Sequence, residues 1–61
     1  MKISEMKKLL EKNGCYKEKE GTNHEIWYSP ITKQHFPIPR HSSQELGKGI
    51  ERAIRKQAGI K

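Results

Sequence analysis

Apolar residues recur at helical spacing near the start of the chain: Ile3, Met6, Leu9 and Leu10. Ser4 precedes most of them and is a favourable N-cap residue, with the acidic Glu5 in the first turn. Gly14 can adopt the left-handed conformation that commonly ends a helix. The pattern therefore predicts an amphipathic helix that is capped by Ser4 and stops at Gly14.

The middle of the chain has the alternation and composition of strands. Residues 15–20 alternate loosely and carry many charges, and residues 24–28 combine β-branched and aromatic side chains. Turn-forming residues at 21–23 and 29–33 separate these segments from a third at 34–38, where Phe36 and Ile38 share one face. Pro37 cannot donate to a strand ladder, so we expect this third strand to be at an edge or frayed. Trp27 and Tyr28 are expected in the core or in an interface.

The last part of the chain predicts a second amphipathic helix. One side of its helical wheel carries Leu46, Ile50, Ala53, Ile54 and Gln57, and the basic residues lie mostly elsewhere. Gly47 and Gly49 would each cost roughly 1 kcal/mol inside a helix, so we expect a short turn at 43–46 and the main helix at 48–58, ending at Gly59.

These elements predict an α+β fold in the order α-β-β-β-α. Two helices packed on one face of a three-stranded antiparallel sheet would bury both apolar stripes. The 61 residues allow one domain over positions 1–61 with one modest core. We expect that core to contain Ile3, Met6, Leu9, Leu10, Phe36, Ile38, Ile50, Ala53 and Ile54.

Charge and cysteine content narrow the classes of function. The 13 Lys and Arg outnumber 7 Asp and Glu, which favours a polyanionic partner, either nucleic acid or an acidic protein. The single cysteine, Cys15, excludes an internal disulfide and is expected to be a small buried residue.

No segment has the pattern of a signal peptide or membrane span, so we expect a cytoplasmic protein. The histidines and Cys15 show no paired ligand spacing, so no metal or other cofactor is expected.

Three stretches of the chain, which together cover nearly all of it, resemble the HicA toxins. The first contains Lys2, Ile3, Ser4 and Glu5, then Leu9, Leu10 and Gly14; the second is Gly21, Thr22, Asn23 and His24; the third is Pro39, Arg40 and His41, followed by Ile50, Arg52, Ile54, Gln57, Ala58, Gly59 and Ile60. Thr22 stands where serine is common in the family and keeps the hydroxyl. The element order likewise resembles the double-stranded-RNA-binding-domain-like fold.

The resemblance implies the toxin of a type II toxin–antitoxin pair. Such a toxin is an mRNA interferase, an endoribonuclease that needs no metal and is neutralised by a bound HicB-type antitoxin in a hetero-oligomer. The family's catalytic histidine corresponds to His24. The 2′-OH of RNA is itself a nucleophile, so a protein accelerates cleavage by positioning the phosphate, transferring a proton and neutralising charge. The expected RNA-binding residues are Gly21, Thr22, Asn23, Lys7, Lys8, Arg40, His41 and Arg52.

Other interpretations of the same residues stay open at this point. His35 is most simply a solvent-facing strand residue, and His41 is either a phosphate contact or a loop residue. Lysines on the first helix are typical of a solvated surface, and Tyr28 or Trp27 could stack on an unpaired base. The whole chain could instead be a non-catalytic RNA-binding module, or a small basic protein whose only partner is an acidic protein.

Overall fold

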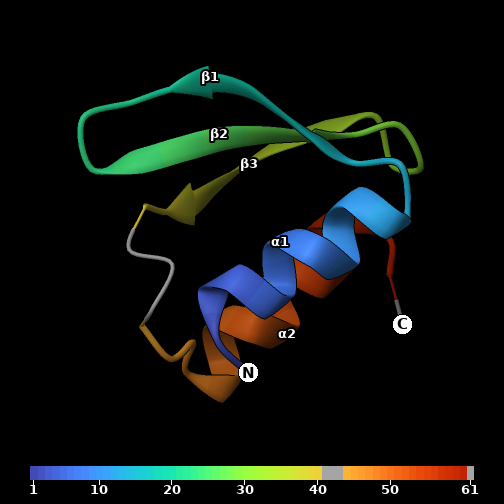
Figure 1. Cartoon of the computed structure of the whole chain (residues 1–61). Coiled ribbons are helices and arrows are strands. Elements are labelled where there is room, and N and C mark those ends of the chain that lie inside the picture. Colours follow the sequence, from blue (N-terminus) through green and yellow to red (C-terminus); the bar gives the residue numbers. More distant parts are fainter. Residues whose placement is uncertain (41–43, 61) are drawn as a thin grey trace.

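The computed structural model describes residues 1–40 and 44–60. Figure 1 shows a helix, three strands and a second helix, which confirms the predicted α-β-β-β-α order. The elements are α1 (Ile3–Lys12), β1 (Tyr16–Glu20), β2 (His24–Ser29), β3 (Gln34–Pro39) and α2 (Lys48–Ala58).

The strands form one antiparallel sheet in the order β1-β2-β3, so β2 is central. Both helices lie beneath the same face of this sheet, as predicted (Figure 1). We call the other side of the sheet the open face. Pro37 lies in β3, which is an edge strand, so the edge position inferred from this proline is confirmed. A bulge between Lys17 and Lys19 interrupts the register of β1 against β2.

The start of α1 differs from the prediction, because Lys2 and not Ser4 is the N-cap residue. The backbone N–H of Lys2 donates to the Glu5 carboxylate over 2.9 Å. A short antiparallel bridge to the segment before α2 holds the chain here, and Ile3 N–H donates to the Gln44 carbonyl over 3.0 Å. That bridge supplies an acceptor at the helix start which local sequence cannot reveal, so the Ser4 prediction was wrong.

The ends of both helices agree with the sequence prediction. Gly14 follows α1 with φ +89°, and Gly59 ends α2 with φ +78°, where a side chain is disfavoured. The end of α2 is also joined to the segment after β2 by side chains. The Ser29 hydroxyl donates to the Ala58 carbonyl over 2.7 Å, and the Thr32 hydroxyl donates to the Gln57 carbonyl over 2.5 Å.

The core lies between the helices and the sheet and includes most of the residues predicted for it. Ile3, Met6, Leu10, Phe36, Ile38 and Ile54 are buried, and Leu9 is half-buried against them. Cys15, Trp27, Leu46 and Ala58 are also buried there. Burial of Cys15 and Trp27 agrees with the expectations for those two residues.

The predicted core residues Ile50 and Ala53 are exposed, so that part of the prediction was wrong. Ile50 is 54% exposed. The buried stripe of α2 instead follows Ile54 and Ala58, which are four residues apart and therefore one above the other. The helical wheel alone could not fix this rotation, because Ile50 and Ala58 are almost equally distant from Ile54 on it.

The arrangement as a whole is that of a double-stranded-RNA-binding-domain-like α+β fold, with two helices against an open sheet. Within the described residues, neither helix has the length and apolar character that crossing a membrane requires.

Candidate active site

A tight turn between β1 and β2 presents His24 at the start of β2. The Gly21 N–H donates to the His24 carbonyl over 2.7 Å. A Cβ atom on Gly21 would lie only 2.8 Å from that same carbonyl oxygen, so the turn requires glycine. Thr22, Asn23 and His24 are all exposed. The turn thus fixes the backbone beside an accessible imidazole.

Arg40 ties the end of β3 to this turn. Its Nη1 donates to the carbonyls of Gly21 and Thr22, over 3.3 and 3.2 Å. Figure 1 shows the end of β3 and the β1–β2 turn at the same end of the sheet. A guanidinium has five N–H donors, so this anchoring uses only part of its capacity. The structure therefore brings together Gly21, Thr22, Asn23, His24 and Arg40, which we call the histidine end.

Strand alternation places His24 on the open face. Trp27 and Ser29 are buried toward the helices, and Ser29 donates to α2. Successive residues of a strand point to opposite sides, so His24, Ile26 and Tyr28 share the open face. Both described helices lie on the opposite side of the sheet (Figure 1). An RNA strand can therefore reach His24 without displacing α1 or α2.

The neighbouring Glu25 lies on the helix side of the sheet and anchors β2 to α1. Its Oε1 accepts hydrogen bonds from Trp27 Nε1 and Lys7 Nζ, each over 3.0 Å. Burial alone would raise the pKa of Glu25, but these two hydrogen bonds and the Lys7 charge outweigh it, and the pKa lies below its usual value. Lys7 is mostly covered in this pair, so binding a phosphate would have to compete with Glu25. RNA binding by Lys7 stays a prediction.

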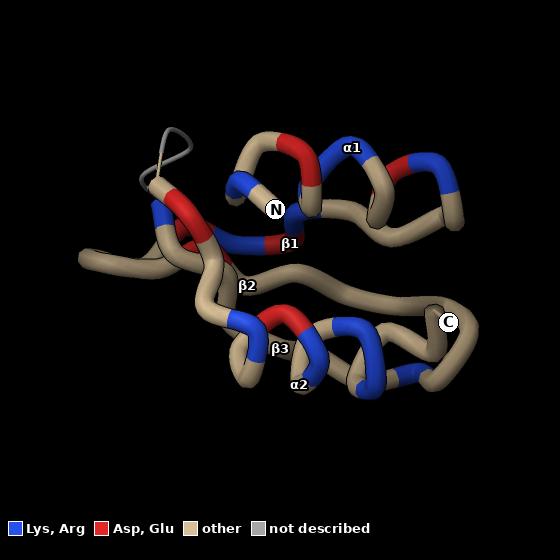
Figure 2. The backbone as a smooth tube through the Cα atoms, turned by 90° about the horizontal axis from the view of Figure 1, so that it is seen from below, with Lys and Arg blue, Asp and Glu red and all other residues tan. Residues whose placement is uncertain are grey.

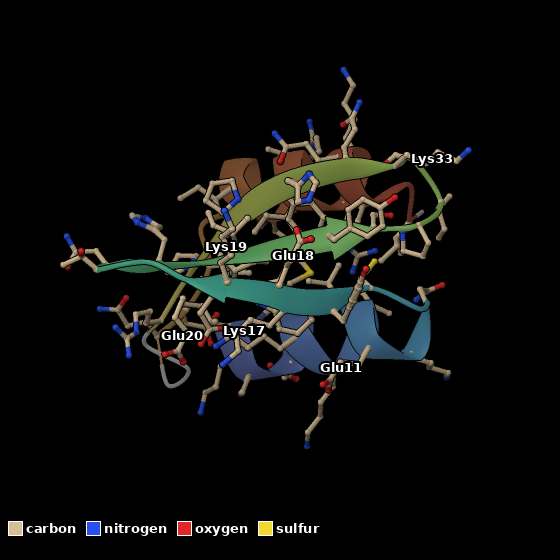
Figure 3. The ribbon with its side chains drawn as sticks, turned by 90° about the horizontal axis from the view of Figure 1, so that it is seen from above. Glu11, Lys17, Glu18, Lys19, Glu20 and Lys33 are labelled. Carbon is tan, nitrogen blue, oxygen red and sulfur yellow. The ribbon has the colours of Figure 1, made fainter. Side chains whose placement is uncertain are left out.

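Further charges lie next to the histidine end on β1. Lys17 Nζ lies 2.9 Å from Glu20 Oε1. The hydrogen bond from Lys17, with the Lys17 and Arg40 charges, lowers the pKa of Glu20. Figure 3 shows Lys17 and Glu20 on the α1 side of β1, whereas Glu18 and Lys19 lie toward the other strands.

Two of the remaining predicted RNA-binding residues, Lys8 and Arg52, lie on the helices. Lys8 is exposed on α1, and Arg52 is exposed on α2, where it lines an open concave surface with Lys48, Glu51 and Arg55. Figure 2 shows basic positions along both helices. His41 lies outside the described residues. Among residues 1–40 and 44–60, no three His, Cys, Asp or Glu side chains gather as metal ligands do.

The open face also carries aromatic residues that sequence reasoning did not group together. The rings of Tyr16 and Tyr28 stack with centroids 5.6 Å apart, and the His35 ring lies 4.9 Å from that of Tyr28. His35 Nε2 contacts the Glu18 carboxylate. Alternation could have placed Tyr28 on the same face as His24, but only the cross-strand register brings Tyr16 and His35 next to Tyr28.

Comparison with known proteins gives two matches and one negative result. The model of the family described as the HicA toxin of bacterial toxin–antitoxin systems matches residues 3–60. A protein of Photorhabdus laumondii subsp. laumondii, named "Probable mRNA interferase HicA 2", is 36% identical over 61 residues, which is the whole of both chains. No solved structure matches the chain significantly. The chain belongs to the HicA family of bacterial toxin–antitoxin toxins.

Proposed function

We propose that this protein is an mRNA interferase, the toxin of a toxin–antitoxin pair, and that His24 carries out proton transfer in a metal-independent cleavage of RNA. The relative named as an mRNA interferase matches the whole chain, which supports the activity. The single observation that supports the site is the exposed His24 on a turn held by Arg40.

The proposed reaction needs only groups that RNA and the histidine end supply. The 2′-oxygen of the nucleotide attacks its own 3′-phosphorus, the bond from phosphorus to the 5′-oxygen breaks, and a 2′,3′-cyclic phosphate forms. The proton of the 2′-OH leaves and the departing 5′-oxygen gains one. Histidine suits either transfer, because its unperturbed pKa lies near neutrality.

Arg40 and the turn would position and neutralise the phosphate. A guanidinium anchored by two carbonyls is oriented before the substrate arrives, so less order is lost on binding. Its positive charge would oppose the negative charge that develops on the phosphoryl oxygens. The Thr22 hydroxyl and Asn23 amide add exposed hydrogen-bonding groups beside it.

We also propose that a HicB-type antitoxin neutralises the protein by covering the histidine end. A ribonuclease acting in its own cytoplasm has to be blocked before it meets RNA. The chain carries a net charge of +6, so an antitoxin that is acidic where it touches this surface would be captured rapidly. A complex that leaves His24 open to an RNA strand would contradict this occlusion.

The chemistry can be tested with a single-stranded RNA that has one cleavage site. The products should end in 2′,3′-cyclic phosphate and 5′-hydroxyl, and replacing the one 2′-OH at that site with hydrogen should abolish cleavage. EDTA should leave the rate unchanged. Activity that disappears with EDTA and returns with magnesium would refute metal-independent cleavage. Binding of RNA without any cleavage would favour the non-catalytic module instead.

A further inference from the structure

Three rings form a row across the open face, one from each strand: Tyr16, Tyr28 and His35, which we call the ring row. Tyr16 lies opposite Tyr28 in the register of β1 and β2, and Tyr28 lies opposite His35 in that of β2 and β3. Tyr16 is 47% exposed although it is a large aromatic residue. The row is therefore a surface feature and not part of the core.

Tyr16 stands at the outer end of this row, on the edge strand β1. Tyr28 stacks on one side of Tyr16, with an angle of 29° between the ring planes. Because β1 is an edge strand, none of the described strands lies beyond Tyr16 on the other side. At the opposite end of the row, the Glu18 carboxylate contacts the His35 ring. The half-exposed Tyr16 ring therefore offers a planar ligand an aromatic surface to stack on.

The same face connects this row to the histidine end. Tyr28 is four residues from His24 along β2, which corresponds to about 13 Å at a rise of about 3.3 Å per residue. Lys19 lies between them, because it pairs with Ile26, the open-face residue midway along this stretch. Among the described residues, Lys19 has no ion-pair partner. Figure 3 shows its side chain toward β2, on the side away from α1.

We infer that single-stranded RNA lies along the open face, with an unpaired base stacked on Tyr16 and a phosphate at Lys19 while the scissile phosphate is at His24. This inference rests on the proposed function. Aromatic rings bind unpaired bases of any sequence by stacking, and an uncharged ring suits a base better than a phosphate. Tyr16 lies across from Tyr28, which is about 13 Å from His24 along β2, so the bound base is not adjacent to the cleaved bond.

The test uses Tyr16→Leu and its matched control Tyr16→Phe, which keeps the ring. Each protein is assayed for cleavage of a 12-nucleotide RNA with one cleavage site, and of copies with a single abasic position. Tyr16→Leu should raise KM for the intact RNA about 5-fold or more, the lower end of what loss of one base stack costs, with kcat unchanged. Tyr16→Phe should behave as the wild type.

The abasic series locates the base that stacks on Tyr16. One abasic position, separated from the cleaved bond, should raise KM for the wild type and have no further effect in Tyr16→Leu. Lys19→Gln should reduce the salt dependence of KM, whereas Tyr16→Leu should leave that dependence unchanged. These readouts distinguish a stacked base from a general loss of structure.

Two results would overturn the inference while leaving the proposed function intact. One is cleavage of the 12-nucleotide RNA by Tyr16→Leu with the KM of the wild type. The other is weakened binding of the antitoxin by Tyr16→Leu with an unchanged KM, which would make the ring row a protein contact. If the wild type itself cleaves no RNA, the proposed function has failed and the inference with it.

Discussion

Gly59 is a residue at which the structure predicts a large loss of stability from one added methyl group. Replacing it with alanine places a Cβ at φ +78°, a left-handed conformation that costs a non-glycine residue about 1–2 kcal/mol. The new Cβ would also lie 2.8 Å from Ile31 Cγ2 and 2.9 Å from Thr32 Cγ2. Moving Thr32 away would weaken its hydrogen bond to the Gln57 carbonyl, a further loss of about 1 kcal/mol.

The predicted loss in the free energy of unfolding for Gly59→Ala is therefore about 2–3 kcal/mol. A chain of 61 residues has a total of about 3–9 kcal/mol, so a loss of this size is a large share of its stability. Gly49→Ala is the control in the same helix. Apart from its chain neighbours and its own helix backbone, none of the described residues comes within 4 Å of its added Cβ, and its φ is not positive, so it should gain about 0.5–1 kcal/mol.

Urea unfolding followed by circular dichroism measures both variants against the wild type. The midpoint should fall for Gly59→Ala and rise for Gly49→Ala, with similar m-values. If Gly59→Ala unfolds within about 0.5 kcal/mol of the wild type, the size usually found for neutral surface substitutions, the described contact between the end of α2 and the segment after β2 is wrong.

Two further predictions concern the core and the anchoring of α1. Ile54→Ala should lower the free energy of unfolding by about 2–5 kcal/mol. Ile50→Ala changes a site that is 54% exposed and should stay within about 0.5 kcal/mol of the wild type. Equal losses in urea unfolding would contradict the described rotation of α2. Because the pKa of Glu25 is lower in the folded protein than its ordinary value of 4.5, it stabilises the fold above that pH, and this contribution is lost as pH falls through the folded pKa. Glu25→Gln should therefore be less stable than the wild type at pH 7, and the difference should shrink by pH 3. Thermal unfolding at both pH values measures this difference. A difference that does not change with pH would count against the pairing of Glu25 with Lys7 and Trp27.

Much of the fold could be predicted from the sequence because local signals agreed with tertiary packing. Gly14 and Gly59 both have the positive φ inferred for helix ends, and Pro37 is at an edge. Phe36 and Ile38 share a buried face because a strand has a period of two. In these cases the local structure follows from the backbone properties of glycine or proline, or from the alternation of side chains along a strand.

The predictions were wrong where the local structure depends on contact with a segment that is distant in the sequence. The start of α1 depends on a bridge between Lys2 and Glu45, which are far apart in the sequence. The rotation of α2 about its axis depends on which of its side chains pack against the sheet. Ile50 is apolar, so the sequence predicted it to be buried, but it is exposed. In the candidate site, the sequence motif pointed to the turn and to Arg40. The contact between Arg40 and the turn depends on the strand register, and so does the formation of the ring row.

The central claim is that His24 transfers a proton in RNA cleavage, and comparison of two histidine variants tests it most directly. His24→Ala and His35→Ala each remove one exposed histidine from the open face. Single-turnover cleavage of one single-stranded RNA should fall at least about 100-fold in His24→Ala, the low end of the contribution of a positioned acid or base. The cleavage step in His35→Ala should stay within a few-fold of the wild type. A correctly folded His24→Ala protein that cleaves as fast as the wild type would contradict the account.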